Sequence, residues 1–158
     1  KEELRARLRV LRRLGYVGQD GVVTLKGRCA ADIASGDELV LCELVFGGAF
    51  NAMTLEQLAA TAACFVWQEK SESSPKLSEP LVPCLAAVRD AARRVGKVAA
   101  ECNMPGAEDV DAYVEGFRPD LMEVTAAWVR GVKFGELAKM TSIFEGSVVR
   151  AVRRLEEL

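Results

Sequence analysis

The stretch TLEQLAATAACFVWQEK, residues 54–70, decides the fold, because it has a helical pattern and is apolar on nearly all sides. Thr54 with Gln57 forms a capping box, in which two side chains satisfy the first free backbone N–H groups of a helix. From Leu58 to Trp67 there is no charged side chain. A helix that is hydrophobic all round is a buried helix. We therefore predict a central helix that other helices surround.

One carboxylate stands out at the end of this segment. Glu69 lies two residues after Trp67, where a negative charge opposes the helix dipole, since a helix C-terminus prefers cations. Two interpretations stay open. Glu69 is either part of a frayed, solvated helix end beside Lys70, or it pairs with an arginine or accepts hydrogen bonds from the amine of a ligand.

Helical patterns continue on both sides of the central segment. Upstream, residues 35–50 begin at Ser35, the expected N-cap, and end at a glycine pair. Downstream, residues 80–102 form the longest helical pattern, and further helices are expected over 119–131, 133–139 and 145–158. The inward positions of the longest pattern are Leu81, Leu85, Val88, Ala92, Val95 and Ala99. The fold class that follows is all-α, a helical bundle over residues 28–158.

The first 27 residues have a different character. Residues 2–14 predict a helix with Leu4, Leu8 and Leu11 on one face, arginines on the other, and Gly15 at its end. The run GVVTLKG that follows, residues 21–27, is β-branched between glycines, which favours a short strand or wing. Helix, turn and strand together are typical of the rear half of a winged helix. We therefore expect residues 1–27 to be the C-terminal part of a winged-helix domain.

Composition excludes several classes of protein. The chain has five cysteines, an odd number with no CxxC spacing, and no histidine. Reduced thiols in an intracellular protein are the expected state, and a zinc site is not expected. No run approaches the ~18 apolar residues of a membrane span, and no signal peptide opens the chain. Phosphate-loop and dinucleotide-binding motifs are absent too, so we expect no catalytic residues and no cofactor in this chain.

Charge is distributed unevenly along the chain. The net charge is -2, but residues 1–28 carry eight Lys/Arg against three Asp/Glu, whereas residues 32–79 carry two against eight. A uniformly basic nucleic-acid binder is therefore excluded, while a local basic stripe on an acidic domain is compatible with these numbers.

The last predicted helix, EGSVVRAVRRLEEL over 145–158, has two faces. One face carries Val148, Val152 and Leu155, and the other carries Arg150, Arg154 and Glu157. The polar face is either a solvated charge cluster or a nucleic-acid contact, for which the planar guanidinium suits stacking and bidentate bonding. Together with the helix over 133–139, it also has the shape of a helix-turn-helix, whose second helix would enter a DNA major groove.

Several long motifs resemble one family. LRRLGYV, VVTLKGRCAADIASGDELVLCELVFGGAFN, CFVWQEK, GFRPDLMEV and KMTSIFEGSVVRAVRRLEEL occur here in order. They are similar to the C-terminal DSHCT region of Ski-two-like DExH-box RNA helicases, the exosome-cofactor group. The resemblance covers most of residues 8–70 and 116–158 and is weak between them. This sequence departs from the family pattern at Cys42, Gly47 and Ser142, and it lacks the family's final helices and tail.

The resemblance implies a function. In the family, two RecA-like motor domains bind ATP and Mg²⁺ and pull single-stranded RNA in the 3′-to-5′ direction, and a winged helix and helical bundle close a ring around the strand. The ratchet helix of the bundle, matched here by residues 145–158, contacts the bases. Its RNA-contacting residues fall on Arg154 and Glu157, a further contact falls on Glu69, and Arg150 lies on the same face.

The resemblance also implies partners, which are the exosome and its adaptor proteins in RNA surveillance, processing and decay. It favours the nuclear branch of the family over the cytoplasmic one, and it implies no membrane. The first hypothesis is therefore an RNA-guiding helical bundle of an ATP-dependent RNA helicase. The alternatives are a helix-turn-helix DNA-binding module and a protein-interaction helical scaffold.

Overall fold

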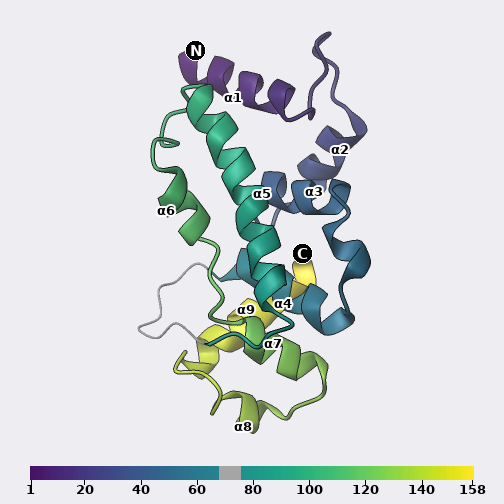
Figure 1. The fold of residues 1–158 in the computed structure, drawn as a ribbon, viewed down its shortest axis with the longest axis vertical. Helices are drawn as coiled ribbons and strands as arrows, with labels where there is room; N and C mark the ends of the chain where they lie inside the picture. The colour runs from purple at the N-terminus through teal and green to yellow at the C-terminus, as the bar shows by residue number, and fades with distance from the viewer. Residues whose placement is uncertain (68–75) are drawn as a thin grey trace.

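Nine α-helices and one short 3-10 helix build the part of the chain that the computed structural model describes, residues 1–67 and 76–158 (Figure 1). They are α1 (Glu2–Arg13), α2 (Leu25–Asp32), α3 (Glu38–Phe46), η1 (Ala49–Ala52), α4 (Leu55–Val66), α5 (Val82–Glu101), α6 (Val110–Glu115), α7 (Met122–Val129), α8 (Phe134–Leu137) and α9 (Glu145–Glu157). In these two ranges the only β-type pairing is a single antiparallel bridge between Val17 and Val23. The all-α class is confirmed.

The central position of α4 is confirmed. Its capping box is present, since the Thr54 hydroxyl accepts from the Gln57 N–H and the Gln57 side chain accepts from the Thr54 N–H at 2.9 Å. Helices α5, α7 and α9 all pack against α4. Its second half is buried, whereas Leu55 in the first turn is exposed. The helix therefore enters the core from the surface and ends inside it.

Helix α5 runs along most of the long axis of the molecule and contacts α1, α3, α4 and α6 (Figure 1). All six positions predicted to face inward on this helix are buried, which confirms that assignment. The main core cluster gathers around it, with side chains from α3, α4, α6 and α7. A smaller cluster joins α4, α7, α8 and α9 at the other end of the molecule.

The predicted strand over residues 21–27 is wrong. Only Val23 takes part in the bridge, and α2 begins at Leu25. The physical reason is Thr24, which acts as an N-cap: its hydroxyl accepts from the Gly27 N–H at 3.1 Å and donates to the Gly15 carbonyl at 2.8 Å. A helix start thus takes the place of the strand, and a winged-helix fragment with a strand is not found here.

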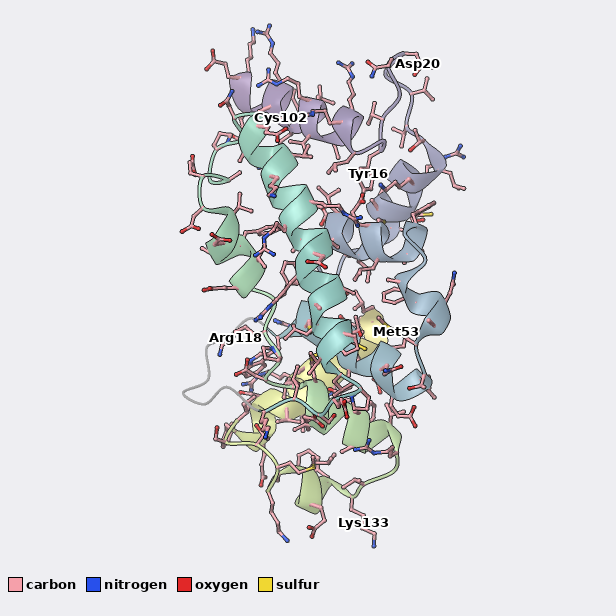
Figure 2. All side chains as sticks on the ribbon, in the orientation of Figure 1. Tyr16, Asp20, Met53, Cys102, Arg118 and Lys133 are labelled. Atoms are coloured by element: carbon pink, nitrogen blue, oxygen red, sulfur yellow. The ribbon has the colours of Figure 1, made fainter. Side chains whose placement is uncertain are left out.

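The predicted apolar face of α1 is wrong at Leu4 and Leu8 and correct at Leu11. Leu4 is 63% exposed, while Ala6 and Val10 are the buried residues of this helix. Helix α1 crosses the end of α5 near Cys102 (Figure 2). There Val10 packs with Ala99 and Cys102. The small side chain of Ala6 and the branched one of Val10 therefore occupy the contact with α5. Leu4 and Leu8 are exposed, whereas Leu11 is half-buried and packs against a cluster that contains Tyr16.

The N-cap of α3 differs from the expectation as well. Asp37, not Ser35, caps this helix, because its Oδ1 accepts from the Val40 N–H at 2.9 Å. By contrast, Gly15, expected to end α1, has φ +80° and follows the last turn of that helix. This left-handed conformation favours glycine, so the end of α1 is confirmed.

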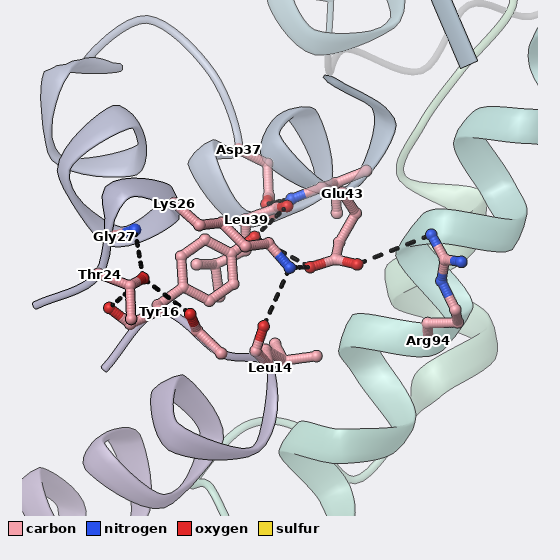
Figure 3. Close-up of polar contacts among 11 residues, drawn as sticks. Leu14, Tyr16, Thr24, Lys26, Gly27, Asp37, Leu39, Glu43 and Arg94 are labelled. Atoms are coloured by element: carbon pink, nitrogen blue, oxygen red, sulfur yellow. Dashed lines mark hydrogen bonds and ion pairs between the residues drawn. The ribbon is translucent and has the colours of Figure 1, made fainter. Parts of the chain in front are cut away.

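A buried polar cluster attaches the N-terminal region to the bundle (Figure 3). The Tyr16 hydroxyl donates to the Leu39 carbonyl at 2.9 Å and to Glu43 Oε1 at 3.1 Å. Lys26 forms an ion pair with the same Glu43 oxygen and lies 4.5 Å from the Tyr16 ring centroid. Arg94 of α5 lies 3.7 Å from the other Glu43 oxygen. Because these groups come from the α1–α2 region, α3 and α5, the cluster holds three parts of the molecule together.

Candidate nucleic-acid interface

Helix α9 is fixed on one side by the second core cluster. Val148 and Ala151 are buried against α4 and α7 side chains, and Leu158, the residue after the helix, packs against both large core clusters. Val152 and Leu155, which were predicted to face inward with Val148, are only half-buried. The predicted packing face is therefore correct in its direction, but it is buried fully only at the start of the helix.

The opposite face of α9 carries the predicted site residues. Arg150, Arg154 and Glu157 are all exposed. The Arg150 guanidinium donates to the Ser147 hydroxyl at 2.8 Å, so it lies back along the helix. Within the described ranges, neither Arg154 nor Glu157 forms an ion pair or a side-chain hydrogen bond. The three do not pair with one another, and a guanidinium and a carboxylate stand side by side, three residues apart.

An apolar cavity of about 270 Å³ lies between the packing face of α9 and the helices α4, α7 and α8. Val148, Val152 and Leu155 line it, and Arg153 lines it as well, whereas Arg154 does not. Trp128 and Phe134 contribute exposed aromatic surface to it. Arg153 and Arg154, although adjacent in sequence, therefore belong to different surfaces.

Glu69, the remaining predicted contact, lies in residues 68–75, outside the described residues. The helix before it ends as expected, since Trp67 is the C-cap of α4 and is buried. The Trp67 indole Nε1 is buried and has no hydrogen-bond partner among the residues that the structure describes.

The C-terminus of α9 meets the start of α3 next to a second cavity. A methyl group placed on Gly36 would lie 3.2 Å from Phe65 Cβ and 3.3 Å from Leu158 Cδ1, so these three residues are in close contact. The cavity, of about 240 Å³, is lined by Asp37, Cys64, Phe65, Tyr113, Gly116 and Phe117. Sequence reasoning missed this site.

A strong hydrogen bond crosses the cavity wall. The Tyr113 hydroxyl donates to Asp37 Oδ2 at 2.6 Å. Burial, and secondarily the charge of Asp37, raises the pKa of Tyr113 above its ordinary value. The two residues are 76 positions apart, so no local pattern could have brought them together. The only indication in the sequence was an acidic residue, Asp37, near the expected start of a helix.

Most of the thiols are buried. Cys29 is exposed, the other four cysteines are buried, and burial raises the pKa of Cys64 to about 12. In the described ranges no three potential metal ligands come together. The same ranges contain no helix with the length and apolar character that a membrane span needs.

Comparison with known proteins identifies the family. The DSHCT (NUC185) domain matches residues 20–158. The DExH-box ATP-dependent RNA helicase DExH9 of Arabidopsis thaliana is 46% identical over 158 residues, 100% of this chain and 16% of that protein. The exosome RNA helicase MTR4 of Homo sapiens is 45% identical over 157 residues, 99% of this chain and 15% of that protein.

A further relative is less similar to this chain. The superkiller complex protein 2 of Homo sapiens is 36% identical over 156 residues, 99% of this chain and 12% of that protein. The chain thus spans about one sixth or less of the length of these relatives. Because the domain match covers most of the chain and the identities extend along all of it, the chain belongs to the DSHCT domain family of Ski2- and MTR4-like DExH-box RNA helicases.

Proposed function

We propose that this chain is the RNA-guiding helical bundle of an ATP-dependent 3′-to-5′ RNA helicase that feeds RNA to the exosome. The observation that carries the proposal is the exposed Arg154–Glu157 face on a helix whose other side is locked into the core. A rigid helix can present two polar groups to a passing strand at a constant distance from the bundle.

The mechanism follows from the chemistry of these side chains. The planar guanidinium group of Arg154 stacks on a base or donates hydrogen bonds to it. Glu157 accepts hydrogen bonds from base amines or orients the arginine. Arg150 and Glu69 add to the same contact. Because stacking needs no fixed donor pattern, the contact tolerates any sequence, and it contributes ~1–3 kcal/mol per base. Such a contact hinders backward slipping while the strand is pulled forward.

The assignment also proposes what surrounds this chain. ATP and Mg²⁺ bind RecA-like motor domains elsewhere in the protein, and this chain contributes no catalytic residue. Residues 1–27 form the C-terminal part of a winged-helix domain, and residues 28–158 form the bundle. The higher identity to the exosome RNA helicase MTR4 than to superkiller complex protein 2 supports the exosome helicase branch, its exosome and adaptor partners, and a nuclear location.

The test is Arg154→Ala in the full-length protein. We expect the rate of unwinding a duplex with a 3′ single-stranded tail to fall about fivefold or more, as the loss of one stacking contact of ~1–3 kcal/mol implies. The basal ATPase rate without RNA stays unchanged, because the motor domains are untouched.

The matched control is Arg153→Ala. Arg153 is also an arginine of α9, but it lines the apolar cavity. We expect no change in unwinding for this variant. Equal losses for both variants, or an unwinding rate unaffected by Arg154→Ala, would contradict the proposal. A joint fall of ATPase and unwinding with a lower melting temperature would indicate a folding defect.

A further inference from the structure

The cavity between α3, α4 and α6 has the features of a site for a single planar ring. At about 240 Å³ it is smaller than the ~300–1,000 Å³ of drug-sized ligand sites. Three aromatic rings stand in its wall. Phe65 and Phe117 meet edge to face with centroids 5.4 Å apart, and Tyr113 meets Phe117 in the same way at 5.6 Å. Such rings pack well against a flat heterocycle.

A carboxylate supplies the polar side of the cavity. Asp37 is half-buried, and each of its oxygens accepts one hydrogen bond, Oδ1 from the Val40 N–H and Oδ2 from the Tyr113 hydroxyl. A carboxylate has about four acceptor sites. Asp37 is therefore held in place by two protein donors and retains acceptor capacity for a donor on a ligand.

The cavity lies next to the C-terminal end of α9. Leu158 directly follows Glu157 and packs against the core cluster that contains Phe65 and Phe117. Gly36, which precedes Asp37, touches both Leu158 and Phe65. Gly116 at the cavity is exposed, while Phe65 and Phe117 are buried. The cavity thus lies close to the C-terminal end of α9, with Gly36 and Phe65 between it and Leu158.

We propose that this cavity takes up one unstacked base of the single-stranded RNA that passes α9, and that Asp37 accepts a hydrogen bond from the exocyclic amine of that base. The inference rests on the proposed function, and it adds a base-selective contact to a sequence-tolerant one. Splayed bases of single-stranded RNA are bound in this manner, by aromatic packing and hydrogen bonds to their edges.

The carboxylate makes the site selective. Cytosine carries an amine at N4, whereas uracil carries a carbonyl at the equivalent position. A carboxylate accepts from the amine and repels the carbonyl oxygen. The two pyrimidines have nearly the same shape, so packing against the rings does not distinguish them. We therefore expect the protein to bind oligocytidine more tightly than oligouridine.

The experiment compares the affinity of the full-length protein for oligocytidine and oligouridine of equal length. Asp37→Asn should lower the ratio of the two affinities about tenfold, the effect of one hydrogen bond to a charged group. Asparagine caps a helix as well as aspartate does, so α3 keeps its start. Its amide also donates to the uracil carbonyl.

The matched control is Asp109→Asn. Asp109 caps α6 by accepting from the Ala112 N–H at 2.9 Å, but it does not line this cavity. This variant should keep the wild-type ratio. A wild-type ratio of one, an unchanged ratio in Asp37→Asn, or an equal change in both variants would overturn the inference.

Failure of the proposed function gives a different result. Arg154→Ala should weaken the binding of both oligonucleotides by the same factor. If it weakens neither, the RNA-guiding role of α9 fails, whatever the ratio. If it weakens both while Asp37→Asn leaves the ratio unchanged, the guiding role stands and the base site is wrong.

Discussion

Glu43 shows how one side chain can join remote parts of the chain. Its carboxylate accepts from Tyr16, pairs with Lys26 and lies within ion-pair distance of Arg94. The Glu43 and Lys26 side chains are only 14% and 19% exposed. Glu43 and Lys26 depend on each other, because both are largely removed from water, whereas the Arg94 side chain is mostly exposed.

Glu43→Gln should therefore lower the free energy of unfolding of the chain by about 1–3 kcal/mol, as expected when one partner of a largely buried charged cluster is removed. Urea denaturation followed by circular dichroism measures the change.

Glu3→Gln is the matched control for this substitution. Glu3 pairs with Arg7 at 2.8 Å, but both side chains are more than half exposed. The substitution should change the free energy of unfolding by less than about 0.5 kcal/mol, since exposed pairs contribute little. Equal effects of the two substitutions would show that the Glu43 cluster does not stabilise the fold.

At the scale of elements, local patterns predicted the helices whose signals are strong. The capping box and apolar run of α4, the six inward positions of α5 and the two faces of α9 were all readable from spacing. These helices are long enough for a 3.6-residue period to be evident. The candidate residues on α9 could be named for the same reason.

Local sequence patterns did not predict the short elements or the long-range contacts. Residues 21–27, which include the start of α2, were predicted as a strand because two valines precede Thr24. The capping role of Thr24 depends on the carbonyls of Gly15 and Tyr16, which lie outside that segment. Helix α6 has six residues, and no helix was predicted there. The Asp37–Tyr113 cavity depends on a pairing across the fold, which periodicity within one segment does not contain.

The start of α2 allows a prediction about the element itself. Gly27 lies in its first turn, and a methyl group there would meet the Tyr16 carbonyl oxygen and lie 2.7 Å from Val23 Cγ1. Gly27→Ala should destabilise the chain by about 1–3 kcal/mol, since backbone and a packed valine must both shift. Thermal unfolding measures the change.

Gly135→Ala in α8 should have the opposite effect on stability. A methyl group at this position meets no atom of residues 1–67 or 76–158 within 4 Å. Alanine forms helices better than glycine, so this variant should be more stable by up to about 1 kcal/mol. A stabilising Gly27→Ala would mean that α2 does not approach the Tyr16 carbonyl as closely as described.

At the scale of the whole molecule, the two tyrosines of the chain both bind the start of α3. Tyr16 reaches it from the N-terminal region and Tyr113 from α6. Burial is the largest cause that raises the pKa of each hydroxyl, and the carboxylates of Glu43 and Asp37 add to it. Both phenols therefore stay protonated in the folded chain at pH values where free tyrosine ionises.

The raised pKa of both tyrosines lowers the stability of the folded chain at high pH. In the unfolded chain each tyrosine loses its proton near pH 10, whereas in the folded chain it keeps it. Above about pH 10 the unfolded state thus binds fewer protons, and stability falls as pH rises. Below that pH the contribution is fully present. We expect the free energy of unfolding to decrease between about pH 9 and about pH 11 more steeply than in a Tyr16→Phe/Tyr113→Phe double variant.

Absorbance provides the direct measurement, because these are the only two tyrosines in the sequence. As pH is raised, tyrosinate absorbance should appear in one step that coincides with the loss of helical circular dichroism, since ionisation requires that α3 lose both contacts. In the double variant the circular dichroism transition should persist without any tyrosinate signal and depend less on pH. Tyrosinate that forms near pH 10 while the helical signal is intact would show that Tyr16 and Tyr113 are accessible in the folded chain, and that α3 is not bound from both sides.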